Sequence, residues 1–261
     1  MSAGAPRPGF LARLNPLAKI AGPLPAMAAV IFTRDLFVPS ALLLASLVLI
    51  LVGARLRAWV VLALIVGTPV VIALLALSFG VWTDPARIDP DAPGATVVLA
   101  EVGDWRFTGA AFLIGLAAAL RIVAVVMLSL IAGLSTTGPE LVRALVQNLR
   151  VPYRIGYTAL AALRFVPRFG HELEVIRAAH RVRGVEHGRG PIAWVRRTLG
   201  LAIPLLASAI RHAERVALAM DARAFGAHPT RTERIISRWR VADAVFVVLC
   251  WAGLVAVLLA G

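Results

Sequence analysis

Cysteine and lysine are almost absent from this chain of 261 residues, which contains one of each, Cys250 and Lys19. A single cysteine excludes an internal disulfide framework and a cysteine-ligated metal cluster. Because Cys250 stands in an apolar run, we expect it to be a small hydrophobic side chain. Loops that cradle nucleotide phosphates follow the pattern GxxxxGK[ST], whose lysine reaches the phosphates. Lys19 stands in no such pattern, so the chain does not hydrolyse ATP by that route.

Acidic residues are also scarce, at 14 against 27 basic residues, and the formal net charge is +13. An excess of this size fits nucleic acid, anionic lipid or an acidic protein as a partner. Hydrophobic residues make up 60% of the chain, whereas soluble domains contain about 45–50%. Because these residues stand in long runs, they indicate a lipid bilayer and make free nucleic-acid binding the weakest of the three.

Five apolar runs have the composition of membrane-spanning helices, which need about 20 mainly apolar residues. The first contains Pro23 and Pro25, and we expect it to be broken or tilted. The first residues of the chain lack the short apolar core of a cleaved signal peptide, so we expect none. The sequence therefore predicts an all-α integral membrane protein with about five transmembrane helices, at residues 17–33, 38–53, 58–81, 107–133 and 241–260.

The charges of the loops predict how these helices are oriented. Residues 134–240 contain 18 arginines and 7 acidic residues, a net charge of +11, whereas residues 82–106 have a net charge of −3. Cytoplasmic loops carry the excess of basic residues, so we expect a cytoplasmic N-terminus and an external C-terminus. The expected division is four spans in 1–133, a cytoplasmic or interfacial segment in 134–240, and a last span in 241–261.

The basic segment 134–240 is predicted to be helical. A helix begins near Ser135–Glu140, where hydroxyl groups, a proline and an acidic residue favour a helix N-terminus; it is stopped by Val151–Pro152. The apolar stretches 155–167 and 198–210 are too short to cross a bilayer, so we interpret them as interfacial or re-entrant pieces.

Two further helices in this segment have similar ends. One is expected at about 168–183, ending at Gly184, and the other at about 203–224, ending near Gly226 with Pro229 beyond. Glycine just past a helix and proline soon after are stop signals. Each helix places an arginine in its last turn, where the helix dipole favours a cation. One face of the second helix carries a stripe of apolar and small residues at helical spacing: Leu206, Ile210, Ala213, Ala217, Met220 and Ala224.

Other candidate sites have less support. The five histidines form no HExxH pattern and favour solvated or interfacial side chains over a metal site. Arg121 lies inside the fourth span, where an ionisable group marks a possible substrate path, but pairing with a backbone carbonyl or an acidic neighbour is the simpler interpretation.

Asp221 beside Arg223 suggests a membrane-bound enzyme acting on lipid phosphate head groups, although such chemistry usually needs several acids or a metal. A membrane-anchored nucleic-acid binder has few aromatic residues for stacking. No cofactor is expected.

Four motifs of this chain, in order, resemble one known family, the transmembrane T subunit of energy-coupling factor (ECF) transporters, of the EcfT/CbiQ/BioN type. The motifs are LNPLAKI at 14–20, STTGPELVRAL at 135–145, LRFVPRFGHELEVIRAAHRVRG at 163–184 and AERVALAMDARAFG at 213–226. The resemblance covers nearly the whole chain and is strongest in 135–226.

The resemblance implies a transport function without catalysis by this chain. In that family two long coupling helices end in motifs of Ala-Arg-Gly type, whose arginines dock in two ATP-binding-cassette (ABC) ATPase subunits, identical or different. A small membrane S subunit binds the vitamin or metal ion, and the T subunit transmits the ATPase motion to it. The location implied is the prokaryotic cytoplasmic membrane, with the lipid bilayer as surroundings and no nucleic-acid partner.

By the same resemblance, the residues that dock the ATPases form two triplets. The first is Val182–Arg183–Gly184, where Val182 replaces the usual small residue. The second is Ala222–Arg223–Ala224, where Ala224 replaces the usual glycine. The surface that contacts the S subunit is expected on the stripe of the second helix, at Leu206, Ile210, Ala213, Ala217 and Met220, and near residues 135–150.

Overall fold

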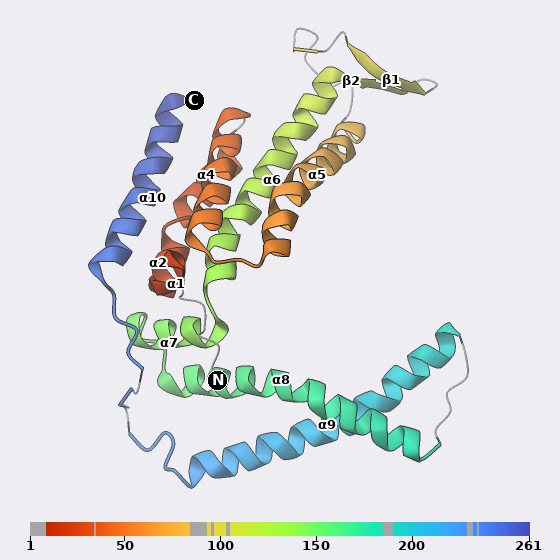
Figure 1. The fold of residues 1–261 in the computed structure, drawn as a ribbon, viewed down its shortest axis with the longest axis vertical. Helices are drawn as coiled ribbons and strands as arrows, with labels where there is room; N and C mark the ends of the chain where they lie inside the picture. The colour runs from red at the N-terminus through yellow and green to blue at the C-terminus, as the bar shows by residue number, and fades with distance from the viewer. Residues whose placement is uncertain are drawn as a thin grey trace. The chain divides into compact units, whose positions relative to one another are not determined.

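A computed structural model of the chain describes residues 9–33, 35–83, 93–94, 97–102, 105–184, 190–228, 232–233 and 235–261. It divides into two compact units. Unit 1 contains Met1–Thr137 and Arg238–Gly261, and unit 2 contains Gly138–Ser237. Apart from one small hairpin, the described elements are helices (Figure 1). The prediction of an all-α membrane protein is therefore confirmed.

Unit 1 contains the apolar helices. Three of them are long and apolar enough to cross a bilayer, namely α5 (Ala58–Val81), α6 (Gly109–Ser135) and α10 (Val241–Ala260). Two shorter apolar stretches are α4 (Phe37–Gly53) and Pro16–Phe32. The latter is broken at Gly22–Pro23 into α2 (Pro16–Ala21) and α3 (Leu24–Phe32), as predicted. The count of five spans and the side of the N-terminus stay predictions.

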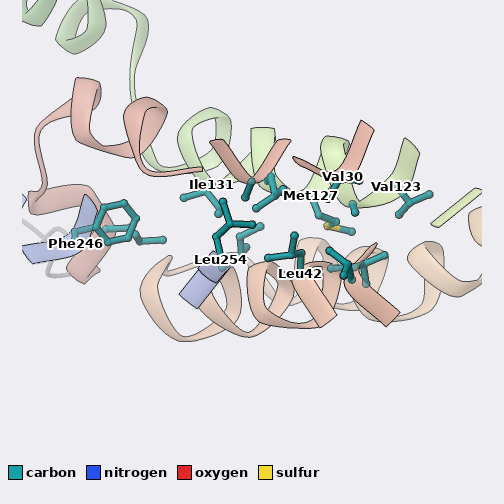
Figure 2. Packing of buried hydrophobic residues seen from close by; sticks show 14 of the residues in the cluster. Val30, Leu42, Val123, Met127, Ile131, Phe246 and Leu254 are labelled. Carbon is teal, nitrogen blue, oxygen red and sulfur yellow. The ribbon is translucent and has the colours of Figure 1, made fainter. Parts of the chain in front are cut away.

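Helix α6 is the centre of unit 1. It packs against α5 most extensively and also against α4, α3 and α2, and Figure 1 shows it between α4 and α5. The core beside it is apolar, and Figure 2 shows Val123, Met127 and Ile131 of α6 facing Val30 of α3 and Leu42 of α4. Phe246 and Leu254 contribute from α10.

Two elements of unit 1 were not predicted. One is a short helix, α1 (Phe10–Arg13), whose Leu11 is fully buried. The other is an antiparallel hairpin of β1 (Val98–Val102) and β2 (Trp105–Thr108), in the region that the charge pattern predicts to be external. The side chain of Thr108 caps the start of α6 by accepting a hydrogen bond from the Ala111 N–H.

Helix α2 carries a group of buried polar contacts in this otherwise apolar unit. Lys19 is 1% exposed and donates to the carbonyl of Ser135 (2.7 Å) and to Oγ1 of Thr136 (3.1 Å), at the end of α6. Asp243, also 1% exposed, accepts the backbone N–H groups of Asn15 (2.6 Å) and Arg240 (2.7 Å), at the start of α10. The ends of two long helices are thus fixed to the same short one.

The described part of unit 2 contains three helices, α7 (Gly138–Asn148), α8 (Tyr153–Val182) and α9 (Pro191–Asp221). The stretches 155–167 and 198–210 are not separate pieces, because the first lies in the first half of α8 and the second in the middle of α9. Their interfacial location stays a prediction. Both helices continue through an internal proline, Pro167 or Pro204. Hydropathy measures whether a stretch can cross a bilayer, and it does not show that a helix continues into polar sequence.

The two long helices contact each other near their middles. The ring of Phe165 on α8 stacks on His212 of α9, with ring centroids 4.3 Å apart and planes at 13°. Two turns further along α8, Glu172 accepts a hydrogen bond of 2.6 Å from the hydroxyl of Ser208 on α9. These two contacts fix which residues of α8 and α9 face each other.

Close packing of α5 on α6 depends on glycine, and a paired substitution tests it. A Cβ added at Gly115 of α6 would lie 2.2 Å from the carbonyl oxygen of Ala76 on α5, whereas one at Gly133 of the same helix would meet nothing within 4 Å. We expect Gly115→Ala to lower stability by about 1–3 kcal/mol, because the α5 backbone must move. Gly133→Ala should leave stability equal or slightly higher.

The measurement is the unfolding midpoint of each detergent-solubilised variant, followed by tryptophan fluorescence. Equal midpoints for Gly115→Ala and Gly133→Ala would contradict the described packing of α5 on α6.

Candidate functional site

Each of the two predicted arginine triplets stands at the end of a long helix of unit 2. Arg183 directly follows α8, and Ala222–Arg223–Ala224 directly follows α9. The residue after each arginine has left-handed backbone, with φ of +63° at Gly184 and +52° at Ala224. The two triplets therefore share a backbone conformation as well as an arginine. Arg183 and Arg223 are both exposed.

The turn at Ala224 is a complete Schellman motif, in which two hydrogen bonds satisfy the last carbonyl groups of a helix. The N–H of Ala224 donates to the carbonyl of Asp221 (2.9 Å), and the N–H of Phe225 donates to that of Met220 (3.0 Å). Glycine usually takes this left-handed position, because a Cβ there costs about 1–2 kcal/mol. The alanine at position 224 therefore keeps the turn but adds strain to it.

The end of α8 is more exposed than the end of α9. Val182 is 89% exposed, and a Cβ added at Gly184 would meet nothing within 4 Å. Gly184 makes the corresponding 3.1 Å bond to the carbonyl of Arg181. Within the described residues, no hydrogen bond joins the triplet 182–184 to another helix. The Arg183 guanidinium is thus presented on an exposed helix end.

The end of α9 is instead held by the chain that follows it, of which the structure describes residues 225–228, 232–233 and 235–237. We call these described residues the return segment. Arg154 of α8 donates to the carbonyl of Gly226 (2.5 Å), and the Tyr153 hydroxyl donates to that of His228 (2.6 Å). Tyr153 also packs edge-on against Phe225, with ring centroids 5.7 Å apart. These contacts fix the turn that carries Arg223 against the start of α8.

Further along, the return segment is bonded to α7 and α8. The side-chain amide of Gln147 donates to the carbonyl of Ile235 (2.9 Å) and accepts from the N–H of Ser237 (2.6 Å). The hydroxyl of Tyr157 donates to the carboxylate of Glu233. The Arg223 end is therefore pre-organised by several contacts.

A pocket of about 870 Å³ lies between the return segment and the three helices of unit 2. Its lining includes three arginines, one from each helix region: Arg143 of α7, Arg164 of α8 and Arg223. The carboxylate in the lining belongs to Glu233, which is bonded to Tyr157. Sequence reasoning missed this pocket, because Arg143 and Arg164 lie far from the helix ends that the motifs identify.

The apolar stripe of α9 is largely exposed. Leu206 is 63% and Ile210 52% exposed, and Ala213 and Ala217 are exposed too. Met220 is half-buried and lines the pocket. The exposed apolar surface also extends towards the start of α9, where Leu199 is 62% and Ile203 75% exposed. A surface of this kind on one helix is typical of a contact with another protein or with lipid.

The remaining candidates gain no support. Arg121 is half-buried and donates from Nε to the carbonyl of Ala117 (3.2 Å), one turn back in its own helix, so the simpler interpretation holds. His212 is stacked on Phe165. Over the described ranges, no three His, Cys, Asp or Glu side chains converge as metal ligands would, and Asp221 is exposed.

Comparison with known families gives one match over most of the chain. The model of the CbiQ family, described as "Cobalt transport protein", matches residues 9–233. The match includes both arginine triplets and the whole of the pocket lining apart from Ile235.

Curated relatives are similar over shorter stretches. The "Energy-coupling factor transporter transmembrane protein EcfT" of Staphylococcus aureus is 32% identical over 139 residues, 50% of this chain and 52% of the relative. The protein of the same name from Thermotoga maritima is 31% identical over 163 residues, 59% of each chain. That of Exiguobacterium sibiricum is 32% identical over 173 residues, 63% of this chain and 66% of the relative. The matched part therefore spans about half to two thirds of these relatives.

The strain at Ala224 predicts opposite effects of two glycine substitutions in one triplet. Ala224→Gly should stabilise the end of α9 by about 1 kcal/mol, because glycine adopts positive φ without steric cost. Ala222→Gly should destabilise it by about 0.5–1 kcal/mol, because Ala222 has ordinary right-handed backbone, with φ of −60°.

Hydrogen exchange of the Phe225 amide, which is bonded to Met220, measures this local effect. It should slow about fivefold in Ala224→Gly and quicken in Ala222→Gly. A change of the same sign in both variants would contradict a left-handed Ala224.

Proposed function

The chain belongs to the CbiQ family, and on this premise we propose that it is the transmembrane coupling subunit of an ECF-type importer for a vitamin or a transition-metal ion. The observation that carries the proposal is the matched pair of helix ends, each with an exposed arginine followed by a left-handed residue. A repeated end of this kind suits two copies, or two relatives, of one partner. The relatives' names describe a transmembrane transporter protein, which supports a non-catalytic role.

In this proposal the two arginines dock in two ABC ATPase subunits, which hydrolyse the ATP. A guanidinium offers a planar fork of donors that pairs with a carboxylate in two parallel hydrogen bonds. Long helices such as α8 and α9 transmit a displacement at one end to the surfaces they carry, because a packed helix moves largely as a rigid element. The contact between Phe165 and His212 couples the two helices to each other.

The S subunit, which would bind the transported substrate, is proposed to contact the exposed stripe of α9. Leu206, Ile210, Ala213 and Ala217 present apolar and small side chains there, and small residues allow close approach of helices in a membrane. Met220 belongs to the pocket rather than to this open surface. Unit 1 is proposed to hold the complex in the bacterial cytoplasmic membrane, with the N-terminus and residues 134–240 on the cytoplasmic side.

Charge reversal at both helix ends tests ATPase docking. In Arg183→Glu/Arg223→Glu, a carboxylate would face the acidic groups of each ATPase groove, and like charges across an interface are strongly unfavourable. We expect the amount of ATPase that co-purifies with the chain from its own membranes to fall at least about tenfold. The amount of chain inserted in the membrane should not change, since both residues are exposed.

A matched control is Arg177→Glu/Arg211→Glu, which makes the same change of charge at exposed positions away from the helix ends. It should retain the ATPases. Normal recovery of the ATPases with the first variant, or equal loss with both, would refute the docking role of the triplets.

The two helix ends should also contribute unequally. The Arg223 turn is already held by the return segment. Docking of an ATPase there therefore orders fewer residues than docking at the unsupported end of α8 does. We expect Arg223→Glu alone to reduce substrate uptake in cells more than Arg183→Glu alone. Equal uptake by the two single variants, at equal expression, would argue against this difference.

A further inference from the structure

Two arginines of the pocket in unit 2, Arg143 and Arg164, have no role in the function proposed above. No hydrogen bond or ion pair within the described residues engages the guanidinium group of Arg143, Arg164 or Arg223. The carboxylate of Glu233 accepts a hydrogen bond from Tyr157, which also belongs to the lining. The described lining residues include three arginines and one glutamate, a formal charge of +2, and an anion would relieve the repulsion between the guanidinium groups.

The pocket is also amphiphilic. Besides its polar groups, its lining includes Leu160, Val216, Met220, Phe225 and Ile235. At about 870 Å³ it lies in the size range of pockets for whole organic ligands, roughly 300–1,000 Å³. A free phosphate ion would fill only a small part of this volume and would leave the apolar side chains facing water. A ligand that is both anionic and apolar matches both kinds of side chain in the lining.

Two residues of the pocket lining are close in sequence to predicted membrane spans. Arg143 follows the last residue of α6 by eight positions, and Ile235 precedes the first residue of α10 by six. Basic pockets next to the cytoplasmic ends of membrane helices are where anionic lipid head groups bind. Arginine suits a phosphate group because its fork of donors pairs with two phosphate oxygens at once.

We propose that this pocket binds an anionic phospholipid, with the phosphate group between Arg143, Arg164 and Arg223 and part of the acyl region against the apolar lining. The site overlaps the ATPase-docking triplets at Arg223, whereas Arg143 and Arg164 lie outside them. Since Arg223 belongs to both, a bound lipid would hold the return segment and the second triplet in one arrangement.

Calorimetric titration of the delipidated full-length chain in mild detergent tests this proposal. The probes are dihexanoyl phosphatidylglycerol, dihexanoyl phosphatidylcholine and inorganic phosphate, all soluble in water. The variant is Arg143→Gln/Arg164→Gln, which leaves both triplets intact. The control is Arg177→Gln/Arg211→Gln, which removes the same charge from exposed positions of α8 and α9 that do not line the pocket. Far-UV circular dichroism and gel filtration confirm that each variant is folded.

We expect phosphatidylglycerol to bind the unaltered chain and the control with equal affinity, and the pocket variant about tenfold or more weakly, because charge-assisted hydrogen bonds are lost. Phosphatidylcholine and inorganic phosphate should each bind the unaltered chain at least about tenfold more weakly than phosphatidylglycerol. ATPase recovery with the pocket variant should stay normal, which separates this proposal from the docking role of the triplets.

Other results would overturn the proposal. Inorganic phosphate that binds as tightly as phosphatidylglycerol would identify a site for a free phosphate. Equal weakening in the pocket variant and the control would indicate diffuse attraction to a basic surface. Absence of lipid binding together with loss of ATPase from the pocket variant would assign Arg143 and Arg164 to a protein contact.

Discussion

Two buried charges on and beside helix α2 fix the points at which the chain leaves unit 1 and returns to it. Lys19 is bonded to the end of α6 at Ser135 and Thr136, just before unit 2 begins at Gly138. Asp243 is bonded to Asn15 and Arg240, just after unit 2 ends at Ser237. Burying a charge is costly unless hydrogen bonds and nearby charge compensate it. Here each charge also faces the helix end of opposite dipole, Lys19 at the C-terminal end of α6 and Asp243 in the first turn of α10.

This arrangement has a mechanical consequence for the proposed coupling. Both covalent connections of unit 2 begin at positions held by one short helix, so a force on α8 or α9 acts on fixed points of unit 1. The break at Gly22–Pro23 makes α2 a separate element and allows it to lie between the ends of α6 and α10. The predicted break in the first apolar run is therefore what allows α2 to contact the ends of both α6 and α10.

Composition and periodicity predicted the helices of unit 1 well, because apolar runs of about 20 residues have few alternatives in a bilayer. They predicted the lengths of α8 and α9 poorly, since each helix passes from apolar to arginine-rich sequence at Arg164–Arg168 or Ile210–Arg215. The positions of Arg183 and Arg223 at helix ends follow from the glycine stop signals. The left-handed conformation of Ala224 does not, because alanine gives no local indication of positive φ.

The contacts of the return segment could not be predicted from local sequence. Its bonds join residues 72 to 90 positions apart, from Arg154–Gly226 to Gln147–Ser237. Tyrosine, arginine and glutamine side chains bonded to backbone carbonyls leave no periodic pattern, because the partner is a peptide group that every residue has. The pocket is a consequence of these long-range bonds, and so it too was absent from the sequence analysis.

Lysine and arginine have different roles in this chain, one in the buried interior of unit 1 and the other at exposed helix ends and around the pocket. The chain has 26 arginines and a single lysine, and the lysine is the one basic residue placed in a nearly fully buried site among the residues described. An ammonium group has three donors on a flexible stem, so a few oxygen atoms at the end of α6 go far towards satisfying it. A guanidinium has five donors in a rigid fork, and several of them would be left without acceptors in that space. At the exposed ends of α8 and α9, and around the pocket, the same fork is an advantage, because it leaves donors free for an anionic group from outside the chain.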